Sequence, residues 1–138
     1  MIKTDTIIAL ATPPGIGAIS VIRLSGKDSI IISNKLFKPL NNTNIINQNT
    51  HTISLGYIKD SDITIDKVLI SVFKAPKSYT GENIVEISCH GSVFIQQKII
   101  DLFTANRCRL ADPGEFTLRA FLNGKIVLSP AERVGDLI

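Results

Sequence analysis

The stretch NIVEISCHGSVFIQQKIIDLFT, residues 83–104, decides the fold class because its periodicity changes in the middle. In residues 83–90 apolar and polar side chains alternate, with Val85, Ile87 and Cys89 on one side. This period of two is typical of a strand with one covered face. From residue 92 to 104 the apolar side chains return at helical spacing instead. The change predicts a strand followed directly by a helix that packs on a sheet.

The rest of the chain repeats these two kinds of segment. Residues 5–11 and 18–24 read as short strands, and residues 51–59 and 66–74 read as an antiparallel pair joined by a polar turn. Ser25-Gly26-Lys27-Asp28 has the spacing of a capping box, which predicts a helix from there to about Phe37. Residues 38–50 are polar and Asn-rich, as in a surface loop. Together these segments predict an α+β fold with a mostly antiparallel sheet and packed helices.

Two further helix starts lie near the end of the chain. Asp112-Pro113-Gly114-Glu115 offers an N-cap acceptor, a proline at the first helical position and a glutamate at the third, and Asn123-Gly124 predicts the end of that helix. Ser129-Pro130-Ala131-Glu132 repeats the starting pattern without any stop signal. We therefore expect the sequence to be the front part of a longer protein.

Composition limits the class of protein. The 138 residues are 44% hydrophobic and 20% charged, which suits one globular domain. The net charge of +3 is mild and no run of basic residues is present, so no nucleic-acid footprint is visible in the sequence. Cys89 and Cys108 have no metal-site spacing, and we expect buried thiols. No apolar stretch reaches the roughly 20 residues of a membrane span, and we expect a soluble cytosolic protein.

The phosphate-binding motifs of nucleotide-binding proteins are absent from this sequence. The loop Pro13-Pro14-Gly15-Ile16-Gly17 is followed by neither the Lys-Ser/Thr pair of a P-loop nor a helix, so it reads as a turn between strands. Asn34-Lys35-Leu36-Phe37 begins like a guanine-reading NKxD element but has Phe at the carboxylate position. We expect that this chain alone neither binds nor hydrolyses GTP.

Three charged residues are candidates for a site, although local sequence favours an ordinary role for each. Glu86 lies in an apolar strand, where a carboxylate is costly unless it is solvated or paired. A half-exposed Glu86 paired with a Lys or Arg is the simplest explanation. Arg23 reads in the same way as a structural ion-pair partner, and Lys125 reads as an exposed loop lysine.

Four sequence blocks taken together change this interpretation. They are Asp5-Thr6-Ile7 with Ala11-Thr12-Pro13-Pro14-Gly15; Ile22-Arg23-Leu24-Ser25-Gly26; Ser78-Tyr79-Thr80-Gly81-Glu82 through Val85-Glu86 to His90-Gly91; and Pro113-Gly114-Glu115-Phe116 with Arg119-Ala120-Phe121-Leu122-Asn123, Lys125 and Ala131-Glu132. In this order and spacing the chain resembles the N-terminal domain of the MnmE (TrmE) family of tRNA modification GTPases. The resemblance spans nearly the whole chain and is weakest between about residues 28 and 65.

The resemblance implies a function. Members of the family use this domain to form a homodimer and to bind a tetrahydrofolate derivative, 5-formyl- or 5,10-methylene-, near the subunit interface. The implied fold is similar to the folate-binding domain of the glycine-cleavage T protein. The family's folate-binding positions fall on Arg23, Glu86 and Lys125, all of which match in identity. The implied roles are Glu86 as acceptor for the pterin edge and the two cations as contacts for the remaining oxygens.

The resemblance also implies partners for the full-length protein. A G domain outside this chain would bind GTP, magnesium and potassium. With the FAD-dependent MnmG (GidA), the protein would modify C5 of wobble uridine in tRNA, with folate as the one-carbon donor. Residues 1–124 would then be the folate-binding and dimerisation domain, and residues 125–138 its end and the start of a helical domain. The alternatives are a stand-alone one-carbon transferase and a scaffold for dimerisation that binds no folate.

Overall fold

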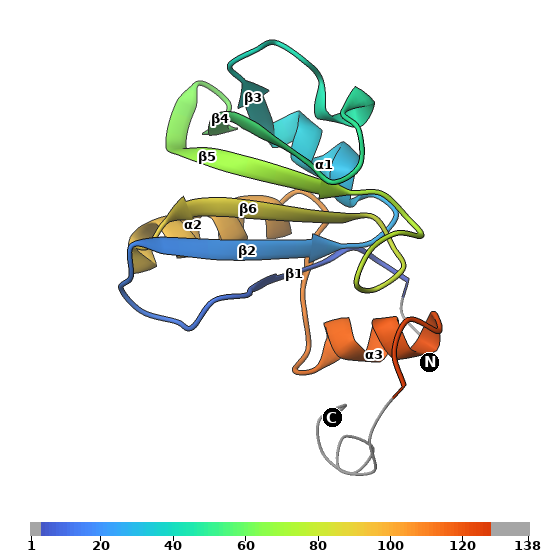
Figure 1. Ribbon diagram of the computed structural model, residues 1–138. Helices are drawn as coiled ribbons and strands as arrows, with labels where there is room; N and C mark the ends of the chain where they lie inside the picture. Colours follow the sequence, from blue (N-terminus) through green and yellow to red (C-terminus); the bar gives the residue numbers. More distant parts are fainter. Residues whose placement is uncertain (1–3, 128–138) are drawn as a thin grey trace.

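The computed structural model describes residues 4–127, which form one mixed seven-stranded sheet with helices packed against it. The strand order is β3-β4-β5-β6-β2-β1-β7. Every neighbouring pair is antiparallel except β1 and β7, which are parallel. The α+β class with a mostly antiparallel sheet is confirmed (Figure 1).

The elements follow one another along the chain with short connections. The strands are β1 (Ile7–Leu10), β2 (Ile19–Ser25), β3 (Phe37–Pro39), β4 (Thr52–Asp60), β5 (Ile63–Phe73), β6 (Ile84–His90) and β7 (Arg109–Leu110). The helices are α1 (Ser29–Leu36), a 3-10 turn η1 (Ile45–Asn47), α2 (Val93–Thr104) and α3 (Glu115–Leu122). The helix predicted from Ser129 lies outside the described residues.

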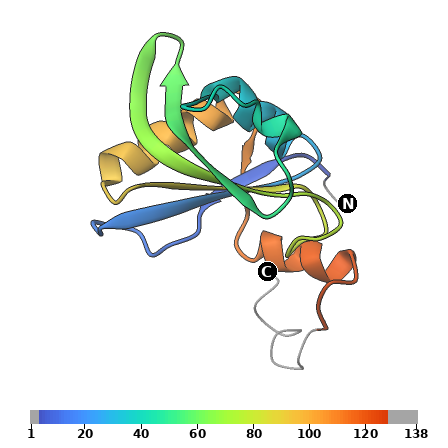
Figure 2. The same cartoon turned by 45° about the horizontal axis from the view of Figure 1, so that its top comes forward.

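Helices α1 and α2 cover the same face of the sheet, and α3 stands apart from them near the β1 side (Figure 2). The apolar side of β6, with Val85, Ile87 and Cys89, faces the helices and is buried. Phe103 and Ile99 of α2 are fully buried against it. The alternation in residues 83–90 and the helical period in 92–104 therefore predicted this layer correctly, because burial on one face imposes both periods.

Two helix starts differ from the prediction. The expected capping box at Ser25 is wrong: α1 begins at Ser29 with Asp28 as N-cap, and no side chain caps it. The Ser25 hydroxyl instead bonds to Thr80 and Glu82 in the distant loop before β6. Helix α3 begins at Glu115, two residues later than the proline pattern indicates, after Gly114 in the left-handed region at φ 74°.

The burial of the two cysteines and the lengths of the helices were also predicted from the sequence. Cys89 and Cys108 are free and buried, as predicted. Burial raises the pKa of Cys89 to about 11 and the pKa of Cys108 to about 12. Among residues 4–127, no helix is long and apolar enough to cross a membrane.

Candidate functional site

Arg23 and Glu86 meet on the face of the sheet that α1 and α2 leave open. They are direct cross-strand partners in the register of β2 and β6. Their chain neighbours Ile22 and Val85 are fully buried, so alternation turns both charged side chains outward. The Arg23 guanidinium donates from Nε to Glu86 Oε2 at 2.7 Å, and Nη2 lies 2.7 Å from the same oxygen. Both contacts use Oε2, so the pairing does not occupy Oε1.

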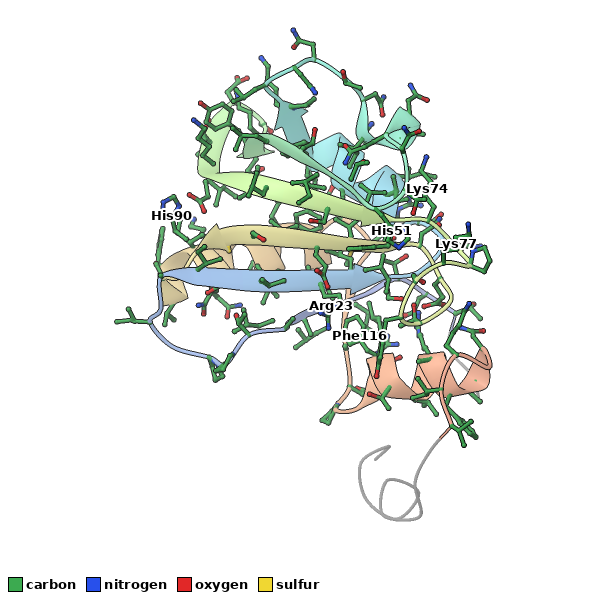
Figure 3. All side chains as sticks on the ribbon, viewed as in Figure 1. Arg23, His51, Lys74, Lys77, His90 and Phe116 are labelled. Atoms are coloured by element: carbon green, nitrogen blue, oxygen red, sulfur yellow. The ribbon has the colours of Figure 1, made fainter. Side chains whose placement is uncertain are left out.

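This ion pair lies in a cleft of about 380 Å³. The cleft is lined from strands β2, β5 and β6, the loop 74–83 and helix α3, and its lining residues are Arg23, Phe73, Tyr79, Ile84, Glu86, Phe116 and Thr117. The sheet provides the charged floor, and the loop 74–83 and α3 provide the walls. Figure 3 shows Arg23 on the sheet directed toward Phe116 on α3. The volume and mixed lining are typical of a small-molecule site.

Aromatic side chains form the walls of the cleft. The Phe116 ring centroid lies 6.0 Å from Arg23 Cζ, a cation–π contact. Tyr79 from the loop shares a hydrogen bond of 3.2 Å with Thr117 on α3, so the two walls are connected. Arg23 and Glu86 remain partly accessible, with 33% and 27% of their side chains exposed. A planar ligand could therefore contact the rings and the carboxylate together.

A buried ion-pair network holds α3 in the position that forms this wall. Arg119 of α3 is 5% exposed and contacts Asp5 at 3.1 Å, Glu82 at 3.1 Å and Glu115 at 3.5 Å. Arg109 of β7 contacts Asp5 at 2.7 Å and Glu115 at 2.6 Å. These contacts link α3 to β1, to β7 and to the loop before β6. Phe116 and Thr117 are positioned by this network.

The same network shifts the proton affinities of its carboxylates. The hydrogen bond from Arg109 lowers the pKa of Asp5 below its ordinary value, with the charges of Arg109 and Arg119 adding to the effect. Burial raises the pKa of Glu115, but hydrogen bonds from Arg109 and from the Asp112 amide, with the two arginine charges, outweigh burial and lower it. Both carboxylates are therefore ionised throughout the neutral range.

Hydrogen bonds also hold the C-terminal part of the loop 74–83 in place. Ser25 Oγ donates to Glu82 Oε1 at 2.8 Å and lies 2.7 Å from Thr80 Oγ1. Asn123, at the end of α3, donates to the Thr80 carbonyl at 2.7 Å. The loop thus contacts both β2 and α3, and these contacts place its Tyr79 in the lining of the cleft.

Lys125 lies next to this loop rather than in the cleft. It follows the end of α3, as predicted, and is exposed. A Cβ atom placed on Gly81 would lie 3.2 Å from Lys125 Cε, so the lysine side chain runs along the loop. The structure therefore brings Arg23 and Glu86 together in the cleft. Lys125 lies beside the loop 74–83 and is not one of the residues that line the cleft.

The aromatic walls and the ion-pair network were not recognised as site features in the sequence. Tyr79 and Phe116 lie inside the blocks that carry the family resemblance, and that was the signal available for them. Phe73, Ile84 and Thr117 carried no signal, because an apolar strand end and a helix threonine are common anywhere. The pairing of Glu86 with an arginine agrees with the simplest explanation from local sequence.

Comparison with known proteins places this chain in a family. The model of the family described as the GTP-binding protein TrmE N-terminus matches residues 6–125. The chain belongs to this TrmE family. It is 59% identical over 138 residues, all of the chain, to a tRNA modification GTPase MnmE of Flavobacterium johnsoniae, of which it covers 30%. It is 50% identical over 136 residues, 97% of the chain, to that of Moorella thermoacetica, of which it covers 29%.

The relatives match nearly the whole of this chain but a much smaller share of their own length. A protein of the same name from Christiangramia forsetii is 59% identical over 134 residues, 97% of this chain and 28% of the relative. The chain thus spans less than a third of the length of the curated relatives it matches. Its described residues contain the cleft, and the matched region 6–125 includes Arg23, Glu86 and Lys125.

Proposed function

We propose that this TrmE-family chain is a module that binds a reduced folate, and that the folate pterin occupies the cleft above Arg23 and Glu86. The observation that carries the proposal is the placement of this ion pair at the floor of an aromatic-walled cleft. The proposed binding residues are Arg23, Glu86 and Lys125, with 5-formyl- or 5,10-methylene-tetrahydrofolate as the ligand.

The chemistry of the cleft suits a pterin. The amino and ring N–H edge of a pterin offers two neighbouring donors, and Glu86 Oε1, which Arg23 does not contact, can accept from that edge. Arg23 fixes Glu86 through Oε2 and leaves Oε1 open as an acceptor. Phe116 and Tyr79 supply aromatic faces for a flat ring. Lys125, beside the loop, would attract the carboxylates of the folate tail. The bound folate would supply a one-carbon unit.

The family membership supports a proposal for the whole protein. We infer that the full-length protein is a GTPase of tRNA modification whose GTP, magnesium and potassium bind outside this chain. With the FAD-dependent MnmG it would modify C5 of wobble uridine in the cytoplasm. The curated relatives bear the name tRNA modification GTPase, and this chain covers about 30% of the first of them. Residues 1–124 would be the folate and dimerisation domain.

A homodimer is part of the proposal. The open face of the sheet carries exposed apolar side chains, namely Ile19, Ile53, Leu55 and Leu69. Ile53 pairs with Ser71, which pairs with Glu86, so this apolar surface continues directly from the floor of the cleft. Apolar surface of this kind favours contact with another protein surface. A second copy on this face would lie next to the folate site.

Calorimetry with 5-formyl-tetrahydrofolate tests the site. Saturable heat with one ligand per chain is expected for the unaltered protein. Glu86→Ala and Glu86→Gln should both remove it, because neither side chain offers the paired anionic acceptor. Asp62→Asn, a change of the same kind in the exposed β4–β5 turn, should bind like the unaltered protein. Unchanged binding by both Glu86 variants would sink the assignment.

The outcomes also separate the alternatives. A stand-alone transferase would release the one-carbon unit to an acceptor when this chain alone is assayed with a methylene folate, and we expect no turnover. A scaffold without folate would sediment as a dimer and give no heat with any reduced folate.

A further inference from the structure

A second cleft of about 380 Å³ lies at the other end of the sheet. It is formed where the β4–β5 turn approaches the ends of α1 and α2, and its lining includes Lys35, Lys38, Lys59, Asp60, Leu102 and Asn106. In Figure 1 this turn lies on the opposite side of the molecule from α3. The eleven residues of β5 separate the two clefts, roughly 30 Å along an extended strand.

The lining of this cleft is rich in unpaired positive charge. Lys35, Lys38 and Lys59 come from α1, β3 and β4, and among the described residues none of them forms an ion pair. The acids in the described ion pairs are contacted by arginines or by His90, so none of those acids is a salt-bridge partner of the three lysines. Asp60 is the one acid in the cleft lining and lies in no described salt bridge.

These lysines are scattered in the sequence and gather only in the fold. Positions 35, 38 and 59 form no basic run, which explains why the sequence gives no nucleic-acid footprint. Lys38 and Lys59 are brought close because β3 pairs with β4, where Phe37 faces Ile58 and Lys38 faces Tyr57. The strand register thus brings lysines from separate segments of the chain to the lining of one cleft.

We propose that this lysine cleft (Lys35, Lys38 and Lys59) contacts backbone phosphates of an RNA strand. Lysine ammonium groups bind phosphates as mobile point charges and need no fixed geometry. The inference rests on the proposed tRNA substrate of the full-length protein. It assigns this chain a direct part in holding the RNA, at a surface distant from the folate cleft.

The helix ends favour a phosphate chain over a compact anion. A small phosphate is usually held by backbone N–H groups at a helix N-terminus. Here α1 ends at Leu36 and α2 at Thr104, so both helices present their C-terminal, carbonyl ends toward the cleft. An anion deep in the cleft would meet those carbonyls. Phosphates that stay at its rim, where Lys38 is exposed, meet the ammonium groups instead.

The test uses Lys38 and Lys59, because Lys35 in the last turn of α1 also complements the helix dipole. The double variant Lys38→Gln/Lys59→Gln is compared with Lys27→Gln/Lys77→Gln. The control removes the same charge from two exposed lysines outside the cleft. Binding of a fluorescent tRNA transcript to the 138-residue chain is measured by anisotropy over a series of salt concentrations, with calorimetry of 5-formyl-tetrahydrofolate in parallel.

The expected result is specific to the cleft variant. Loss of two phosphate contacts should weaken tRNA binding by roughly tenfold or more at low salt and lower the slope of log affinity against log salt by about 2. The control variant should change neither the tRNA affinity nor the salt slope by a comparable amount. Inorganic phosphate should compete with tRNA no better than chloride does at equal ionic strength.

Three results would overturn the inference: no tRNA binding by the unaltered chain, equal loss in both double variants, or competition by low concentrations of inorganic phosphate, which would indicate a small-anion site. Folate binding by the cleft variant should remain that of the unaltered chain. Absence of folate heat in the unaltered chain would instead count against the proposed function.

Discussion

The guanidinium of Arg23 contacts the Glu86 carboxylate in the cleft that we propose for folate and holds its orientation. We expect Arg23→Gln to weaken binding of 5-formyl-tetrahydrofolate by roughly tenfold or more, because a hydrogen bond to a charged group contributes about 1.5–3 kcal/mol. Arg23→Lys keeps the charge and loses the two-point contact, so an intermediate affinity is expected. Calorimetric titration measures both. Equal affinity in all three proteins would show that Arg23 has no part in the site.

The two thiols give a second prediction for single residues. Burial raises the pKa of Cys89 to about 11 and that of Cys108 to about 12, so at pH 8 no more than about one thiol in a thousand is the reactive thiolate. We expect neither to be alkylated by iodoacetamide at pH 8 in the folded protein within the time that labels both in 6 M guanidinium. Rapid labelling of one cysteine in the folded chain, located by mass spectrometry, would contradict its burial.

At the scale of elements, α3 depends on the ion pairs of Arg119. This arginine is 5% exposed and contacts three carboxylates. Its removal leaves the half-buried Glu82 without a cationic partner and takes one of the two arginines from Asp5 and Glu115. Arg119→Met should lower the free energy of unfolding by about 3 kcal/mol, measured with urea. It should also weaken folate binding, since Phe116 and Thr117 lose their support. Arg107→Met, a change at an exposed arginine outside these pairs, should leave both nearly unchanged.

The same network predicts how stability depends on pH. The folded-state pKa of Glu115 is lowered, so its contribution is present above the unfolded value of 4.5 and is lost as pH falls through the folded value. The pKa of Asp5 is also lowered in the folded state, from an unfolded value of 3.8, so Asp5 contributes to stability in the same way. The melting temperature should therefore fall as the pH drops below about 4.5. In Glu115→Gln the fall should be shallower, and the melting temperatures of the two proteins should converge once the pH lies below the folded-state pKa of Glu115. Parallel curves would contradict the assignment.

The elements that could be predicted from sequence are those governed by local periodicity. The period of two in β6 and the helical period of α2 both record burial against one layer, and residues a few positions apart carry that information. Ser25 was predicted wrongly for the opposite reason. Its position satisfies the capping pattern locally, but its hydroxyl forms hydrogen bonds with Thr80 and Glu82, more than fifty positions away, instead of with the helix. The short strands β3 and β7 also depend on partners distant in the sequence.

At the scale of the whole molecule, the site shows a similar division. Residue identity at Arg23, Glu86 and Lys125 was available from the family resemblance. The pairing of the first two needed the register of β2 with β6, and the walls needed α3 to be held against β1 by Arg119 and Arg109. The lysine cleft needed β3 to pair with β4. Each of these depends on contacts between segments whose separation hides them from any local pattern.

The open face of the sheet predicts how the whole molecule assembles. Leu55 and Leu69 are cross-strand partners on this face and are more than 40% exposed. If a second copy covers them, Leu55→Lys/Leu69→Lys places two ammonium groups in an apolar interface and should convert a dimer to a monomer in sedimentation velocity. Val93→Lys/Phe94→Lys adds the same charge at exposed positions of α2, behind the sheet, and should remain dimeric. A dimer that survives the leucine changes would place the interface elsewhere, and a monomeric unaltered chain would show that assembly needs more than these residues.

Loss of dimer together with weaker folate binding would link the two sites, because Ile53 and Glu86 flank the same residue, Ser71, on this face.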